Sequence, residues 1–210
     1  RAGVNAGNSI TSGGNYNVTI GDEAGTALTT GDNNVAIGFE ALKTEDTHGF
    51  NVAIGYQALK TQDAGADAQN TAIGYKAGTA ITTGIQNTLM GSNTAIALTD
   101  ADFNTAIGQQ ALLQDTKGNK TTAIGHGALG TQNFTSSTDS HNTAVGFSAG
   151  ASVSTGLYNT LIGSLTGDAI STGGYNVAVG TLALSTETAG QKSVAVGYGA
   201  LSTQNLTSAT

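Results

Sequence analysis

The sequence predicts an all-β fold, a parallel β-solenoid of the β-roll or β-helix type, from three observations. A short motif that ends in glycine returns along the whole chain at a nearly constant spacing. The repeating unit is rich in Gly, Thr, Asn and Val, which are poor helix formers. Charged residues stay out of the motif and gather at expected turns. Together these features indicate short stacked coils and no helices.

The motif reads Asn-Val-Ala-Ile-Gly or a close variant, beginning with NVTIG at 17–21 and NVAIG at 34–38. Its closing glycine, here called the marker glycine, recurs every 17 to 21 residues. The marker glycines are Gly3, Gly21, Gly38, Gly55, Gly74, Gly91, Gly108, Gly125, Gly146, Gly163, Gly180 and Gly197. We therefore expect about twelve coils of 17 residues in one solenoid domain over 1–210, a fragment of a longer chain.

The four residues before each marker glycine fit a short strand with period-two alternation. We expect the Ile, Val or Met just before the glycine, and the Val or Thr two places earlier, to face the core. Ala and Asn then face the other way. The glycine is expected to close the strand at a positive φ. A second short strand is expected three to nine residues after the marker.

Two places after the marker predict how the coils are grouped. Where the fourth residue is Leu, as at Leu42, the seventh is polar, as at Glu45. Where the fourth is Gly or Ala, as at Gly25, the seventh is a large aliphatic residue, as at Leu28. Each coil thus supplies one bulky side chain, because interiors tolerate neither voids nor surplus volume. The pattern switches every two coils and predicts super-repeats at 3–73, 74–145 and 146–210.

Extra residues enter at 63–69 and 133–141, in the last coil of the first two super-repeats. Insertions are tolerated in exposed loops, so we expect both segments at one edge of the solenoid.

Composition excludes several classes of partner. The net charge is −7 and only 7 of the 210 residues are Lys or Arg. Binding of nucleic acid or anionic lipid needs clustered basic residues, so neither partner is expected. No apolar run is long enough to span a bilayer, so no membrane insertion is expected. The absence of Cys excludes disulfide bonds.

The pattern N-[TV]-A-[IV]-G-[YF]-x-A-L, as in NVAIGYQAL at 51–59 and NTAIGYKAG at 70–78, resembles repeats of bacteriophage tail-fibre and bacterial surface proteins. Such repeats often precede a self-cleaving chaperone domain of the endosialidase type. The chain is more loosely similar to the head repeats of trimeric autotransporter adhesins. The resemblance implies a homotrimer, and it carries no catalytic residues onto this chain.

Aromatic residues occupy two places in the repeat, directly after the marker glycine and directly before the Asn of the strand. Such rows can bind sugars, stack along the coil edges or fill a trimer seam. Six rings are candidates for contact with a host carbohydrate or protein: Phe39, Tyr56, Tyr75, Phe147, Tyr198 and Phe134.

The recurring Asn predicts a structural ladder of stacked side-chain amides, as repeated Asn forms in in-register strands. Its members are Asn17, Asn34, Asn51, Asn70, Asn87, Asn104, Asn142, Asn159 and Asn176. Thr121 and Ser193 take the place of Asn in two coils.

Other patterns carry no chemistry. GHGALG at 125–130 matches a dinucleotide fingerprint, but the repeat already accounts for each residue. Asp139, Ser140 and His141 are adjacent, whereas catalytic triads assemble from separated segments. The other two histidines are His48 and His126, and no acidic cluster has calcium-loop spacing. No cofactor, metal or catalytic residue is expected.

The favoured function is therefore a non-enzymatic one, a structural and adhesive rod segment of a trimeric fibre on a virion or bacterial surface. Turns and loops would contact a host glycan or protein. The alternative is a monomeric surface-binding solenoid, above all an ice-binding one, suggested by the pairs at 29–30 and 82–83. These Thr pairs occur only in coils whose seventh residue after the marker glycine is aliphatic. The Thr array that ice binding needs is therefore interrupted every two coils.

Overall fold

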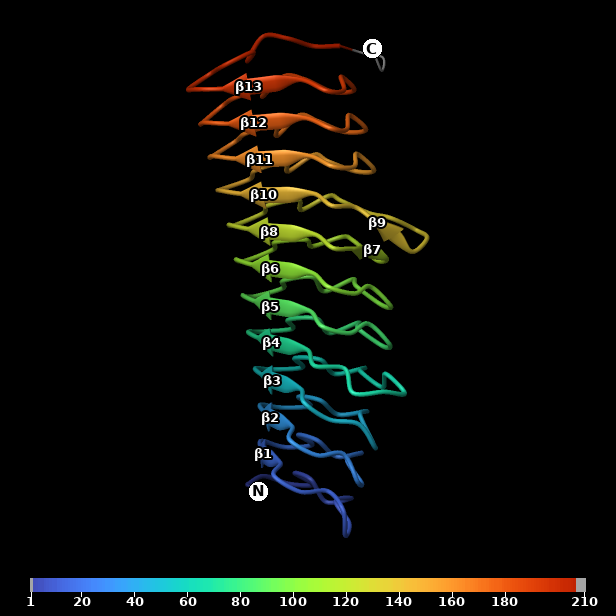
Figure 1. Cartoon of the computed structure of the whole chain (residues 1–210). Coiled ribbons are helices and arrows are strands. Elements are labelled where there is room, and N and C mark those ends of the chain that lie inside the picture. Colours follow the sequence, from blue (N-terminus) through green and yellow to red (C-terminus); the bar gives the residue numbers. More distant parts are fainter. Residues whose placement is uncertain (1, 207–210) are drawn as a thin grey trace. The chain divides into compact units, whose positions relative to one another are not determined.

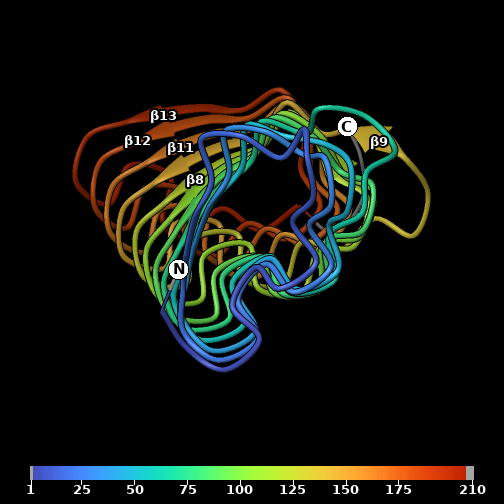
Figure 2. The ribbon, with the colours of Figure 1, turned by 90° about the horizontal axis from the view of Figure 1, so that it is seen from below.

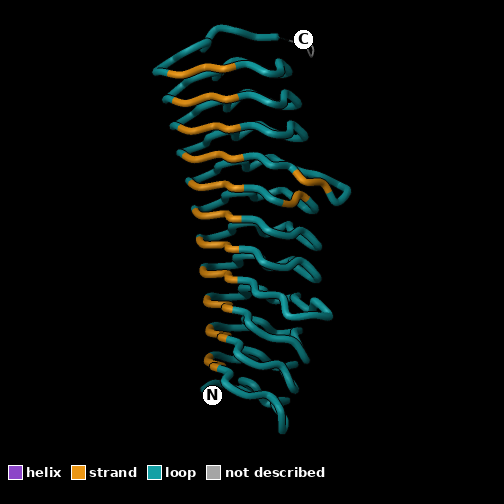
Figure 3. Tube along the Cα trace, viewed as in Figure 1, coloured by secondary structure: helices purple, strands orange, loops and turns teal. Residues whose placement is uncertain are grey.

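The computed structural model describes residues 2–206 and forms two compact units, Arg1–Asn104 (unit 1) and Thr105–Thr210 (unit 2). Each unit is a parallel β-solenoid in which one three-residue strand per turn pairs with the strand of the next turn (Figure 1; strands orange in Figure 3). The described residues contain no helix, and so none that is long and apolar enough to cross a membrane. The predicted all-β solenoid class is confirmed.

Unit 1 holds five strands in chain order: β1 (Val18–Ile20), β2 (Val35–Ile37), β3 (Val52–Ile54), β4 (Thr71–Ile73) and β5 (Thr88–Met90). All neighbours are parallel, and each motif residue pairs with the same motif residue of the next turn. An isolated bridge between Ala2 and Ile20 adds the turn before β1. The constant spacing of the repeat therefore sets the register.

Unit 2 repeats this arrangement with β6 (Thr105–Ile107), β8 (Thr122–Ile124), β10 (Thr143–Val145), β11 (Thr160–Ile162), β12 (Val177–Val179) and β13 (Val194–Val196). These strands are also parallel and in register. Two further strands of two residues, β7 (Gly118–Asn119) and β9 (Thr138–Asp139), pair with each other. The sequence pattern did not indicate this second pair.

The strands face the opposite way from the prediction. In β2 and β3 the central residues Ala36 and Ala53 are fully buried, while the Val and Ile on either side are partly exposed. The preceding Asn34 is buried as well. Ala and Asn thus point inward and the aliphatic residues point outward. Alternation with period two defines two faces of a strand but not which one lies inside.

Bulk in the core comes from the other half of the coil. Leu42 and Leu59, at the fourth place, are fully buried, as are Leu28 and Ile81 at the seventh. A Cβ built on Gly25 would lie 2.8 Å from Leu28 Cδ1, so the aliphatic residue fills the space that Leu takes elsewhere. Small inward Ala residues on the strand leave room for these side chains.

The predicted second strand is wrong, because residues after the marker form turns. φ is positive at the second and fourth places, with values of 54° at Glu40 and 48° at Leu42. Ala41 N donates to Gly38 O at 3.2 Å within the turn, and Leu42 N donates to Ala58 O at 3.0 Å in the next coil. Left-handed residues at alternate places are incompatible with an extended strand.

The marker glycines have φ between 118° and 141°, which confirms the expected positive φ. At Gly38 a Cβ would lie 2.5 Å from the carbonyl oxygen of Gly55, the next marker. Glycine is therefore needed for both conformation and close approach of successive coils.

The inserted segments 63–69 and 133–141 are mostly exposed, as expected, although Ala68, Phe134 and Ser140 are buried. The second segment contains β9, and Figure 2 shows its loop extending away from the turns of unit 2.

Candidate functional site

The recurring Asn residues of unit 1 form a continuous row inside the coils. The backbone N–H of each donates to the side-chain Oδ1 of the Asn one coil earlier, as in Asn34 to Asn17 (2.8 Å) and Asn87 to Asn70 (2.8 Å). The links in between measure 3.0 Å (Asn51 to Asn34) and 3.1 Å (Asn70 to Asn51). The row thus runs mainly through side chain and backbone, rather than through stacked amides alone.

Most Nδ2 groups in this row donate to a backbone carbonyl 14 residues later, as in Asn34 to His48 O (3.0 Å) and Asn70 to Gly84 O (2.7 Å). Each Asn side chain therefore satisfies a buried N–H of the following Asn and a buried C=O of the turn. Such groups are costly to leave unpaired, so this row is structural.

In unit 2 the row runs over Asn142, Asn159 and Asn176, with backbone donors at 2.9 and 3.1 Å. Thr121 replaces Asn before β8, where its Oγ1 lies 2.7 Å from Ser140 Oγ. Asn142 N donates to that serine at 3.2 Å. The hydroxyl groups of Thr121 and Ser140 thus take the place of one Asn side chain in this coil.

The rings that follow the marker glycine are half-exposed and stack on one another. Phe39 and Tyr56, and Tyr56 and Tyr75, have ring centroids 5.3 Å apart with interplanar angles of 20° and 15°. Lys76 Nζ lies 5.4 Å from the Tyr75 centroid. The faces of Tyr56 are therefore covered by its neighbours, and its outer edge is what this ring offers to a partner.

Other candidate rings differ in their surroundings. Phe147 stacks on His126 at 5.3 Å, and Tyr198 is 81% exposed. Phe134 is only 6% exposed and does not present its ring to solvent, contrary to the expectation for a contact residue. Its backbone N–H donates to buried Asp115 Oδ1 at 3.0 Å, which draws this part of the inserted loop inward.

A second stack involves the rings before the strand. His141, Tyr158 and Tyr175 have successive centroids 5.1 and 4.9 Å apart. The neighbours of His141 in the chain have other partners: Asp139 pairs with Lys120, and Ser140 is buried against Thr121. The three adjacent residues thus engage three different groups, which does not build a nucleophile–base pair.

The outward face of the strands is apolar in each unit. In unit 1 the Val and Ile residues of β1 are about half-exposed, together with Met90 of β5. In unit 2 Ile162 and Val177 are partly exposed. Thr residues share this face in the middle strands, including the in-register row of Thr105, Thr122, Thr143 and Thr160.

Glu40 lies at the centre of an ion-pair network across three coils. Lys43 Nζ lies 2.7 Å from its Oε1 and Lys60 Nζ lies 2.7 Å from its Oε2. Gln57 Nε2 donates to Oε2 at 2.8 Å, and Lys43 also pairs with Glu23. These donors, led by Lys43, lower the pKa of Glu40 to about 2.

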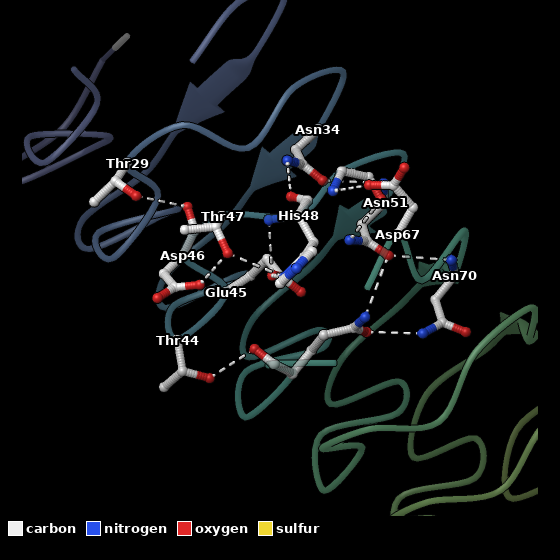
Figure 4. A network of polar contacts seen from close by, with 12 residues as sticks. Thr29, Asn34, Thr44, Glu45, Asp46, Thr47, His48, Asn51, Asp67 and Asn70 are labelled. Carbon is white, nitrogen blue, oxygen red and sulfur yellow. Dashed lines mark hydrogen bonds and ion pairs between the residues drawn. The ribbon is translucent and has the colours of Figure 1, made fainter. Parts of the chain in front are cut away.

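One turn of unit 1 brings the side chains of three neighbouring residues close to one from the next coil, and all four are of types that bind metals. Glu45, Asp46 and His48 lie on this turn, and Asp63 comes from the same turn one coil later; one donor atom of each lies within 4.8 Å of the others. Figure 4 shows the first three of these residues beside the Asn row. We name this set of four the Glu45 cluster. Sequence reasoning missed it because Asp63 comes from the next coil and the four residues match no known ligand spacing.

Glu45 is fully buried, and burial raises the pKa of its carboxyl group. Its Oε1 accepts a hydrogen bond from His48 N at 3.3 Å and lies 3.4 Å from His48 Nδ1. Its Oε2 has no hydrogen-bond partner.

By its fold, the protein belongs to the class of parallel β-solenoids, and a row of Asn side chains lies inside its coils. No protein-family model, curated protein sequence or solved structure matches the chain at a significant level.

Proposed function

We propose that the chain is a structural and adhesive rod segment of a homotrimeric fibre, located at a virion surface or on a bacterial cell surface and without a catalytic role. The observation that carries this proposal is the outward strand face, with its partly exposed Val, Ile and Met side chains in each unit. Soluble monomers rarely expose contiguous apolar patches of this kind.

Self-association would cover this face. The side chains repeat in register from turn to turn, so a second copy of the chain offers the same spacing of apolar residues. Closed homo-oligomers are the usual solution for such self-complementary surfaces. The trimeric state itself rests on the resemblance to fibre and adhesin repeats.

We further propose that about twelve coils are grouped in fours, which places the inserted segments 63–69 and 133–141 at corresponding turns. Their exposed residues and the outer edges of Phe39, Tyr56 and Tyr75 would contact a host glycan or protein. The stacking of these rings supports edge contacts over insertion of a sugar between rings.

The oligomeric mass of the purified chain tests the trimer. Light scattering should give three times the 20.8 kDa chain mass. Ile124→Glu, on the outward face of β8, should yield a monomer, because three buried carboxylates are costly. Ser136→Glu, in an exposed loop, is the matched control and should remain trimeric. A monomeric mass for the unaltered chain at tens of micromolar would contradict the proposal.

An ice-binding solenoid remains the second candidate, favoured by the outward row of Thr105, Thr122, Thr143 and Thr160 in unit 2. The Thr pairs at the turns support it less, since Thr29 Oγ1 and Thr82 Oγ1 already donate to carbonyls of the next coil. Thermal hysteresis of the purified chain, lost in Thr143→Tyr, would favour this candidate over the fibre.

A further inference from the structure

We propose that the Glu45 cluster binds one divalent first-row transition-metal ion, and that Zn²⁺ fits it best. This site does not rest on the fibre proposal, because it uses none of the outward strand face; its one residue from the inserted segment 63–69 is Asp63. The four residues are Glu45, Asp46, His48 and Asp63.

The first argument is the spacing of the donor atoms. Donors around one small cation lie about 2.0 to 2.6 Å from it, and hence roughly 3 to 4.5 Å from one another. One donor atom from each of the four side chains lies within 4.8 Å of the others. Three carboxylates held this closely repel each other, and a divalent cation relieves that repulsion.

The second argument is the unsatisfied oxygen of Glu45. The residue is 0% exposed, and its Oε2 has no partner among the described residues. A buried carboxylate oxygen without a donor is strongly unfavourable whether or not the group is ionised. A metal ion bound by the Glu45 carboxylate would supply a partner for this group.

The third argument is an internal comparison within the chain. Asp115 and Glu187 stand at the same seventh place after a marker glycine as Glu45. Gln132 Nε2 donates to Asp115 Oδ2 at 2.6 Å, and Gln204 Nε2 donates to Glu187 Oε2 at 3.0 Å. In both coils a glutamine from the next coil satisfies the buried carboxylate.

The glutamine at the same place beside Glu45 is Gln62, and its amide is engaged elsewhere. Its Nε2 lies 3.4 Å from Asn51 Oδ1, and its Oε1 accepts from Asn70 Nδ2 at 2.9 Å. In the other two copies, Thr121 and Ser193 take the place of Asn51. There the glutamine Nε2 donates to this hydroxyl group as well as to the buried carboxylate. The two breaks in the Asn row therefore coincide with the two coils in which a glutamine donates to the acid. At Glu45 the Asn row is unbroken, and no glutamine donates to the carboxylate.

The remaining ligands occur only in this copy of the turn. Where the cluster has Asp46, His48 and Asp63, the other two copies have Thr116, Gly118 and Asn133, and Thr188, Gly190 and Asn205. The loss of the glutamine donor thus coincides with the gain of two carboxylates and an imidazole. Both changes are expected if a metal ion replaces the glutamine as the partner of the buried carboxylate.

The donor set indicates which ion binds. Imidazole is a ligand for Zn²⁺ and other late first-row ions, whereas Ca²⁺ and Mg²⁺ take oxygen ligands. Three carboxylates and one imidazole supply four ligands, the number that a tetrahedral Zn²⁺ site needs, and Zn²⁺ accepts both carboxylate oxygen and imidazole nitrogen. A bound ion would join the turn at 45–48 to the inserted segment 63–69, so it would fasten two successive coils.

Calorimetric titration of the metal-free 210-residue chain at pH 7 tests the site. We expect one Zn²⁺ per chain with a Kd tighter than about 100 µM, and no comparable heat from Ca²⁺ or Mg²⁺. Saturating Zn²⁺ should raise Tm by about 5 °C or more.

The matched variant is His48→Gly with Asp63→Asn, because these are the residues at the same places in the other two copies. It should fold, as shown by its circular dichroism spectrum, and should bind Zn²⁺ at least about tenfold more weakly. His126→Ala removes a histidine outside the cluster and should leave binding unchanged. Zn²⁺ binding that survives the double variant, or that is lost in His126→Ala, overturns the assignment, as does preferential binding of Ca²⁺.

Discussion

The backbone N–H of Asn34 donates a 2.8 Å hydrogen bond to Oδ1 of Asn17, one coil earlier in the chain. The same contact recurs between successive Asn residues in each unit, so these turns are tied together by a side chain as well as by the strand ladder. The asparagine at this place therefore connects coils, and its removal affects two of them.

Asn70→Ala should lower the free energy of unfolding by about 2 to 5 kcal/mol, because it leaves three buried groups unpaired. These are Asn87 N, at 2.8 Å from Asn70 Oδ1, and two acceptors of Asn70 Nδ2, Gly84 O at 2.7 Å and Gln62 Oε1 at 2.9 Å. Asn8→Ala, at an exposed site, should change stability by less than about 0.5 kcal/mol. Chemical denaturation of both variants measures the difference, and equal effects would show that the row contributes nothing special.

Gly38→Ala should destabilise the protein by about 3 kcal/mol or more. The residue has φ of 127°, and a Cβ would lie 2.5 Å from Gly55 O in the next coil. Gly65→Ala is the control, because its φ is also positive at 67° but a Cβ there meets nothing within 4 Å. Gly65→Ala should lower the free energy of unfolding by only about 1 kcal/mol. Thermal melts that rank the two variants in the reverse order would refute the close-approach argument.

Ala53→Leu should destabilise by about 1 to 3 kcal/mol, since Ala53 is fully buried and its coil already holds Leu59. Leu89 is accommodated at the corresponding place because it lies beside Gly78, where a Cβ would be 2.7 Å from Leu89 Cδ1. Adding Leu59→Ala should restore part of the loss. A neutral effect of the single substitution, measured by denaturation, would mean that Ala53 does not face a filled core.

Glu40→Gln should lower the free energy of unfolding at pH 7 by about 1 to 2 kcal/mol, after allowance for solvent at its lysine partners. The pKa of Glu40 is lowered from 4.5 to about 2, chiefly by Lys43. A lowered folded-state pKa gives stability that is complete above pH 4.5 and is lost as the pH falls through 2. Denaturation at pH 7, 4 and 2 should therefore show the gap between the two proteins closing, and a constant gap would exclude the ionic origin.

Tyr56→Ala should lower the free energy of unfolding by about 1 to 2 kcal/mol, because Tyr56 stacks between Phe39 and Tyr75. Tyr56→Phe keeps the ring and should leave the free energy of unfolding almost unchanged. Thermal melts of the two variants make the comparison. If Tyr56→Ala leaves Tm unchanged, the stack is not structural and a role of these rings in binding gains weight.

Much of the fold was predictable because it depends on spacing alone. A marker glycine every 17 residues leads to parallel strands in register, as in the pairing of Val35 with Val52. The need for glycine at Gly38 and the row beginning with Asn17 and Asn34 follow from the same spacing. A repeat that places identical residues one above another determines which backbone groups meet.

The sequence by itself therefore determined the class of fold, its register and which Asn residues follow one another from coil to coil. Only the tertiary structure decided that Ala53 faces inward and Ile54 outward. Alternation in the sequence defines two faces of a strand but not which one is buried. The space available inside depends on the side chains of the whole coil. The tertiary structure also decided that Asp63 meets Glu45 and His48, and that Glu45 is buried with an unpaired oxygen. Contacts between coils depend on where each turn bends, and positive φ at residues such as Glu40 and Leu42 is not visible in a pattern of residue types.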